Sequence, residues 1–136
     1  YYWDFEDNLR NLSRGQTPFS PATTLFLQLH ARLEQLEAEG GEVKNIARVH
    51  HRAGIFRRLC REYGWEIPAE VPSFAITGFQ TKEKTPGKVF RSLIEKHQTF
   101  IMPGDRPGFY RVSHMGLQTE EDLRELAGRI HEFETE

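Results

Sequence analysis

Arg111 is the residue whose type and position are best suited to binding chemistry. Tyr110 and Val112 alternate with Arg111 and Ser113, which is the period of a β-strand, and Gly116 ends the stretch. A guanidinium near the end of a core strand is costly to bury unless an anion pairs with it. Either an internal carboxylate or a bound ligand must supply that anion. Local chemistry alone favours the internal partner, because buried arginines are usually paired within their own protein.

A second group of polar side chains lies between Thr17 and Thr24 and includes the hydroxyls of Ser20 and Thr23. Ser20 followed by Pro21 is typical of a helix N-cap, with proline in the first turn, where its missing N–H costs nothing. The free backbone N–H groups and the positive end of the helix dipole can hold a phosphate at such a position. Capping alone explains Ser20, yet the stretch contains more hydroxyls than a cap requires.

The other side chains that could do chemistry do not converge on a site. Six basic residues on a helix predicted over residues 43–63 are interpreted as a solvated face, paired with acids just upstream and without aromatic residues for base stacking. His50 and His51 are adjacent, so they diverge by about 100° on a helix and cannot easily share a metal ion. Cys60 lies on an apolar helix face and is interpreted as an inert core thiol. No zinc-ligand spacing, catalytic triad, phosphate-binding loop or dinucleotide fingerprint supports a metal site or a hydrolase.

The composition bounds the class of protein without naming its function. The chain has 136 residues, enough for one domain with a sizeable core, and 18 basic against 20 acidic residues leave a net charge of −2. This balance gives no sign of a nucleic-acid partner, and no apolar run is long enough to span a membrane. The single cysteine excludes an internal disulfide and favours a reducing, cytoplasmic location. Because aromatic residues crowd the first five positions and no methionine starts the chain, we expect a fragment of a longer protein.

The order of elements predicts an α+β fold. Residues 1–16 mix aromatic, charged and turn residues, and no element is predicted there. Beyond them, the patterns predict a helix over 21–39, a helix over 43–63, a strand over 72–80, a helix over 85–97 that begins at Thr85 and Pro86, a strand over 99–102, a strand over 109–113 and a helix over 119–133. We therefore expect a small, mostly antiparallel sheet covered by helices on one face and preceded by a long linking helix.

Three motifs in this order resemble the C-terminal part of a class V, fold-type I pyridoxal-phosphate aminotransferase. They are residues 15–23, a helix ending at residues 37–40, and residues 110–116 before 119–122. The similarity is to the serine–pyruvate, alanine–glyoxylate and 2-aminoethylphosphonate aminotransferases, and it covers nearly the whole chain. It implies that residues 1–20 are the tail end of a large cofactor-binding domain and linker, residues 21–41 a long interdomain helix, and residues 42–136 the small C-terminal domain.

The resemblance also implies roles for three residues. Arg111 matches the arginine that binds the α-carboxylate of the amino-acid or 2-oxo-acid substrate, a bidentate task for which lysine is a poor substitute. Ser20 matches a hydroxyl, usually of threonine, that reaches the cofactor phosphate of the neighbouring subunit in a homodimer. Thr17 lies one turn before it and is expected to share that phosphate.

The catalytic lysine of the family lies upstream of the matching region, so we expect no catalytic residue in this chain and no activity from it alone. None of the five lysines stands in a matching context: Lys44, Lys82, Lys84, Lys88 and Lys96. The alternative is a free-standing α+β interaction module without catalytic activity, in which Arg111 forms an internal ion pair and Ser20 is a plain helix cap.

Overall fold

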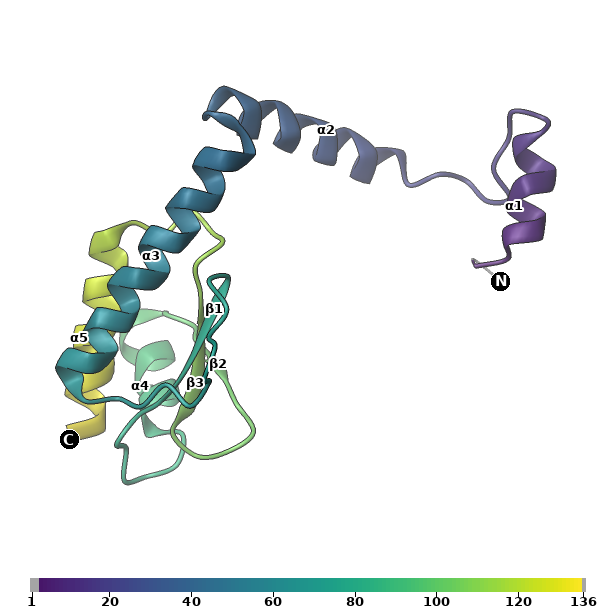
Figure 1. Cartoon of the computed structure of the whole chain (residues 1–136). Helices are drawn as coiled ribbons and strands as arrows, with labels where there is room; N and C mark the ends of the chain where they lie inside the picture. The colour runs from purple at the N-terminus through teal and green to yellow at the C-terminus, as the bar shows by residue number, and fades with distance from the viewer. Residues whose placement is uncertain (1–2, 136) are drawn as a thin grey trace. The chain divides into compact units, whose positions relative to one another are not determined.

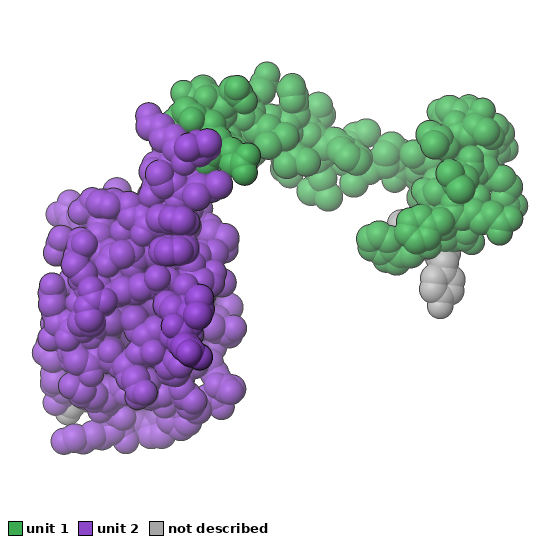
Figure 2. Space-filling model, viewed as in Figure 1, with its two compact units in different colours: residues 1–42 green, residues 43–136 purple. Residues whose placement is uncertain are grey.

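The computed structural model describes residues 3–135, which divide between Glu42 and Val43 into two compact units (Figure 2). The elements follow in the order α1 (Phe5–Leu12), α2 (Thr23–Ala38), α3 (Gly41–Tyr63), β1 (Ile76–Gln80), α4 (Lys88–His97), β2 (Met102–Pro103), β3 (Phe109–Ser113) and α5 (Glu120–Thr135) (Figure 1). No helix within residues 3–135 is long and apolar enough to cross a membrane.

The first unit contains a helix that the sequence pattern did not predict. Helix α1 begins at Phe5 and is capped by Asp4, whose carboxylate accepts a hydrogen bond from the backbone N–H of Asp7 at 3.0 Å. The turn that follows contains Gly15 with φ 65°, a backbone conformation that favours glycine. Helix α1 has only eight residues, too few for a periodic apolar pattern to be distinguished from a loop rich in aromatic residues.

Helix α2 is present as predicted, but its N-terminal cap is not. Ser20 was predicted as the cap, whereas the helix begins at Thr23 with Ala22 as N-cap and without a capping side chain. The backbone N–H of Thr23 donates to the carbonyl of Pro21 at 2.8 Å in a tight turn, so the chain becomes helical only beyond it. No residue of α2 is buried.

The second unit contains the sheet, and it confirms the predicted α+β class. Three antiparallel strands lie in the order β1-β3-β2, with Gly78 of β1 and Met102 of β2 each paired to Arg111 of β3. Helices α3, α4 and α5 lie on one side of the sheet (Figure 1). Their apolar residues form a single core with the inward residues of β1 and β3, in which Phe56, Phe79 and Leu93 are fully buried.

Helix α4 starts later than predicted and has a different cap. Thr85 and Pro86 were predicted to open it, but the N-cap is Gly87 with φ 72°. The carboxylate of Glu83 supplies the missing acceptors: it accepts hydrogen bonds from the N–H groups of Gly87 at 2.9 Å and Val89 at 3.1 Å. A cap supplied by a residue outside the first turn leaves no local sequence signal.

Candidate functional site

The sheet face opposite the helices, here called the open face, carries Arg111. Tyr110 and Val112 point into the core, so the alternation of β3 directs Arg111 away from the helices, and its side chain is exposed. Gly78, Arg111 and Met102 lie directly opposite one another across the three strands. Met102 is exposed on one side of Arg111, and on the other side the Phe109 ring lies over Gly78, where a Cβ atom would come within 2.7 Å of it.

The predicted burial of Arg111 is wrong, and so is the internal ion pair. The guanidinium donates one hydrogen bond, from Nη2 to the carbonyl oxygen of Pro103 at 3.2 Å. No carboxylate among residues 3–135 lies within ion-pair distance of it. Strand alternation shows which residues share a face, but it cannot show which face the helices cover. Any anion for Arg111 is therefore one that the described residues do not supply.

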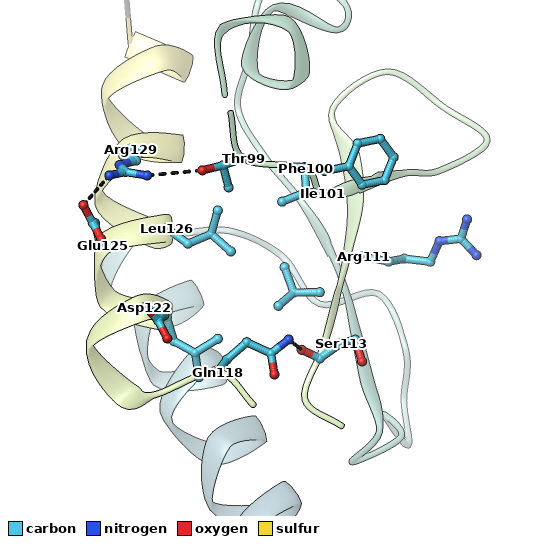
Figure 3. Close-up of a pocket in the computed structure, with 12 residues that line it drawn as sticks. Thr99, Phe100, Ile101, Arg111, Ser113, Gln118, Asp122, Glu125, Leu126 and Arg129 are labelled. Atoms are coloured by element: carbon cyan, nitrogen blue, oxygen red, sulfur yellow. Dashed lines mark hydrogen bonds and ion pairs between the residues drawn. The ribbon is translucent and has the colours of Figure 1, made fainter. Parts of the chain in front are cut away.

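Two hollows border β3 near Arg111. The first, about 320 Å³, lies between β3, α5 and the segment before β2, and Figure 3 shows that the Arg111 guanidinium extends away from it. The second, about 350 Å³, is bordered by Gly104, Asp105, Phe109 and Arg111 itself. A Cβ atom on Gly104 would lie 2.2 Å from the Phe109 ring. Glycine at this position therefore leaves room for the Phe109 ring, over which the guanidinium of Arg106 lies at 4.8 Å from the ring centroid.

The end of β3 is held by His114, a buried residue that the sequence did not single out. Its backbone N–H donates to the carbonyl of Ala75 at 2.8 Å, and its Nε2 is hydrogen-bonded to Thr77 Oγ1 at 2.8 Å. Its Nδ1 is buried without a partner. Burial, with smaller effects of Arg57 and Arg52, lowers the pKa of His114 to about 4. The imidazole is therefore neutral near pH 7 and serves the fold rather than proton transfer at the open face.

Ser20 and Thr17 lie in the first unit, before α2. Both side chains are exposed. Thr17 Oγ1 donates a hydrogen bond to the carbonyl of Phe19 at 2.6 Å, which holds the turn before the helix. Ser20 does not cap α2, so its hydroxyl is available to a ligand. Arg111 belongs to the other unit, so the structure describes these two candidate sites separately.

The lysines and the cysteine lie in contrasting environments. No lysine within residues 3–135 is buried. Cys60 is fully buried, and burial raises the pKa of its thiol to about 12, which agrees with an inert core residue. No group of three or more His, Cys, Asp or Glu side chains in the described part of the chain could hold a metal ion.

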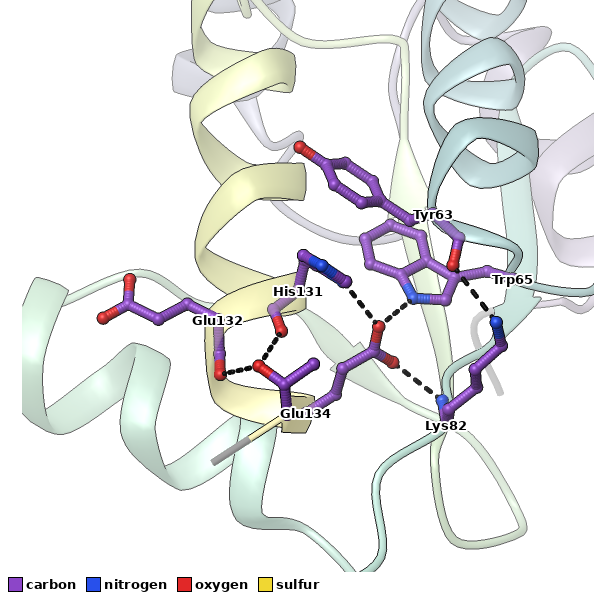
Figure 4. Close-up of polar contacts among 7 residues, drawn as sticks. Tyr63, Trp65, Lys82, His131, Glu132 and Glu134 are labelled. Carbon is purple, nitrogen blue, oxygen red and sulfur yellow. Dashed lines mark hydrogen bonds and ion pairs between the residues drawn. The ribbon is translucent and has the colours of Figure 1, made fainter.

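A separate polar cluster surrounds Glu134 of α5 (Figure 4). Its Oε1 accepts a hydrogen bond from Trp65 Nε1 at 2.7 Å, and its Oε2 accepts one from the backbone N–H of Lys82 at 2.8 Å. His131 Nδ1 lies 3.0 Å from the same Oε1. Because the Glu134 side chain is only 2% exposed and every contact is internal, this cluster fastens the end of α5 to the chain on both sides of β1.

Replacing Glu134 with glutamine should destabilise the chain by about 1–2 kcal/mol, because an amide offers one acceptor where two N–H donors are buried. The measurement is the free energy of unfolding in urea. The matched control is Glu132→Gln on the exposed side of the same helix, which should leave stability within about 0.5 kcal/mol of the unaltered chain. Equal stability of the two variants would contradict a structural role for this carboxylate.

Comparison with known proteins gives a match in structure and none in sequence. No protein-family model matches the sequence, and no curated protein is significantly similar to it. One solved structure that matches is described as the aspartate aminotransferase from Thermus thermophilus that belongs to subgroup IV, with a TM-score of 0.79 and 22% sequence identity. The chain has the fold of an aminotransferase C-terminal domain.

This likeness confirms the fold expected from the sequence motifs, but it extends over only part of the matching protein. The match covers 99% of this chain and 39% of the aminotransferase chain, so most of that protein has no counterpart here. At 22% identity the likeness establishes the fold and not the reaction. The assignment to class V and the roles of Arg111, Ser20 and Thr17 stay predictions.

Proposed function

We propose that this chain is the C-terminal domain of a pyridoxal-phosphate-dependent aminotransferase of class V, which moves an amino group between an amino acid and a 2-oxo acid. The observation that carries the proposal is the exposed guanidinium of Arg111, which has no carboxylate partner among the described residues and stands on the open face of an aminotransferase-like sheet. Its fork of N–H donors suits bidentate binding of an α-carboxylate. Arg111 thus binds and orients the substrate.

The apolar surface of the first unit supports the proposed place of this chain in a larger enzyme. Leu25, Phe26 and Leu29 of α2 are more than half exposed, and so are Phe5 and Leu9 of α1. A soluble protein rarely leaves so many large apolar side chains in water. In the proposal, residues 1–20 end the large cofactor-binding domain, residues 21–41 form the interdomain helix, and both are covered by the rest of the enzyme.

The residues present fit a part of a cofactor site. When bound, pyridoxal phosphate supplies the electron sink that lets an amino group leave one carbon skeleton for another. The exposed hydroxyl of Ser20 can donate to its phosphate, and Thr17 stands close by in sequence as a second donor. In the proposal this phosphate belongs to the neighbouring subunit of a homodimer. No lysine lies beside these residues in sequence, so the catalytic lysine comes from the large domain.

Ser20→Ala should weaken cofactor retention in the full-length enzyme about tenfold, because one hydrogen bond to a charged phosphate is lost. The measurement is the fraction of pyridoxal phosphate that remains bound after dialysis, read from its absorbance. Ser20→Thr keeps the hydroxyl and should retain the cofactor as the unaltered enzyme does. Equal retention by Ser20→Ala would remove Ser20 from the cofactor site.

The full-length protein that contains this chain provides the test of the proposal. It should bind pyridoxal phosphate, and mass spectrometry should detect transfer of the amino group from an amino acid to a 2-oxo acid in a panel of pairs. Its coding sequence should contain about 200 residues before Tyr1, enough for another domain, with a lysine shortly after an apolar strand. A protein that lacks this upstream region, or that neither binds the cofactor nor transfers an amino group, would contradict the proposal.

The second candidate function is that of a free-standing interaction module, which is favoured by the second unit's having a hydrophobic core of its own. In that case the apolar residues of α1 and α2 would bind another protein, and Arg111 would contact an acidic partner. The two functions differ in cofactor binding, because only the aminotransferase domain requires pyridoxal phosphate in the assembled protein.

A further inference from the structure

We propose that Arg52 of α3 is a positioning residue, which fixes the end of β3 and so sets the place where Arg111 holds a substrate carboxylate. This inference rests on the proposed function of Arg111, and Arg52 itself touches no ligand. Sequence patterning placed Arg52 on a solvated face paired with acidic residues. The structure contradicts that prediction, because both hydrogen bonds of its guanidinium go to backbone carbonyls.

The contacts of Arg52 lie at the turn that immediately follows β3. Its Nη1 donates to the carbonyl oxygen of Gly116 at 2.7 Å and, more weakly, to that of His114 at 3.5 Å. Charged donors make stronger hydrogen bonds than neutral ones. The neighbours Ala53, Ile55 and Phe56 are buried in the core, so packing fixes the position of the helix that carries Arg52. Arg52 thus ties the turn to the helix layer.

A second arginine of α3 holds the opposite strand at the same end of the sheet. Arg57 donates to the carbonyl of Ser73 at 2.6 Å and, at 3.4 Å, to Oγ1 of Thr77, the residue bonded to His114. The last pair of the β1–β3 ladder, Ile76 with Ser113, lies between these two attachments. Helix α3 therefore fixes the register of β3 from the core side of the sheet.

Arg111 depends on this attachment because little else within residues 3–135 fixes its side chain. A single hydrogen bond, to Pro103, holds its guanidinium on the open face. The strand backbone therefore sets the direction of the side chain, and its end at Ser113 is two residues away, about 7 Å along the strand. The strand end has two further attachments: Gln118 Nε2 donates to the carbonyl of Ser113 at 3.3 Å, and the backbone N–H of His114 donates to the carbonyl of Ala75 at 2.8 Å. Loss of Arg52 thus loosens the strand end without opening the core.

The test measures equilibrium binding of pyruvate, the probe chosen because its carboxylate is its only charged group. Calorimetry is done on the full-length protein in its pyridoxal-phosphate form, which a 2-oxo acid binds without turnover. Arg52→Met, which keeps the apolar stem, should raise the Kd of pyruvate about tenfold, since displacements near 1 Å can cost up to about 10²-fold. Arg52→Lys keeps the charge and can reach one carbonyl, so its Kd should be intermediate.

Two controls separate positioning from a general structural or electrostatic effect. Arg58→Met removes an exposed arginine of the same helix and should leave the Kd unchanged. In an Arg111→Lys background, Arg52→Met should add little, because the residue it positions is already altered. The thermal unfolding midpoint of each variant shows whether it is folded. If Arg52→Met does not fold, the Kd of Arg52→Lys is used in its place.

The outcomes distinguish this inference from the proposed function. The positioning role would be overturned if folded Arg52→Met had an unchanged Kd for pyruvate. It would also be overturned if Arg52→Met lost the same affinity for pyruvate in the Arg111→Lys background as in the unaltered protein. Either result would leave the function of Arg111 intact. A Kd for Arg52→Lys equal to that of the unaltered protein would overturn it too, because charge alone would then explain the effect. If the unaltered protein binds no pyruvate, the proposed carboxylate site fails, and the positioning role fails with it.

Discussion

Arg111→Lys in the full-length enzyme should raise the KM for amino acids and 2-oxo acids about 10²-fold, with a smaller effect on kcat. Lysine keeps the charge but cannot form the two parallel hydrogen bonds that a guanidinium makes to a carboxylate. Losing the paired geometry of a charged contact costs about 2–4 kcal/mol. Because Arg111 is exposed and packs against no core residue, the melting temperature should not change.

Steady-state kinetics with saturating cofactor measure this effect. Arg124→Lys, on the exposed side of α5, is the matched control and should leave both constants unchanged. Absorbance of the bound cofactor should be the same in all three proteins, because Arg111 is assigned to substrate and not to pyridoxal phosphate. An unchanged KM in Arg111→Lys would remove this residue from the substrate site.

The chain should lose up to about 3 kcal/mol of stability as the pH falls from about 6.5 to about 4, through His114 alone. Burial lowers the pKa of the folded imidazole to about 4, whereas the unfolded chain takes up the proton near pH 6.5. In this window the unfolded state therefore binds more protons. The contribution of His114 to the free energy of unfolding is therefore complete above about pH 6.5 and is lost progressively as the pH falls to about 4.

Urea unfolding at several pH values between 4 and 8 measures this loss. The difference in unfolding free energy between the unaltered chain and His114→Phe should narrow as the pH falls, because phenylalanine does not titrate. His30→Phe replaces an exposed histidine of α2 and should show no such trend. A pH-independent difference for His114→Phe would contradict the buried, neutral state of this imidazole.

Sequence patterns predicted the layers of this fold because apolar periodicity is a local signal. The alternation around Arg111 predicted β3, and the Leu periodicity of α2 predicted a long helix there. Caps were predicted less well: Ser20 and Thr85 both have the right chemistry, yet turn geometry at Pro21 and the distant carboxylate of Glu83 determine where the helices begin.

The polar contacts that organise the second unit could not be predicted, since they join residues far apart in sequence. Arg52 meets Gly116, 64 positions away, and Glu134 meets Trp65, 69 positions away. A basic helix face gives no signal that two of its arginines bind carbonyls instead of acids. The exposure of Arg111 was missed for a related reason, because which side of a strand is covered depends on where later helices pack.

The central claim is that Arg111 recognises an α-carboxylate, and a comparison of two substrates tests it most directly. The measurement is kcat/KM for the amino acid that the full-length enzyme uses best and for the amine obtained by removing its α-carboxylate. The unaltered enzyme should prefer the amino acid by at least about 10³-fold, and Arg111→Gln should remove most of that preference. A preference that survives in Arg111→Gln would contradict the claim, because another residue would then be holding the carboxylate.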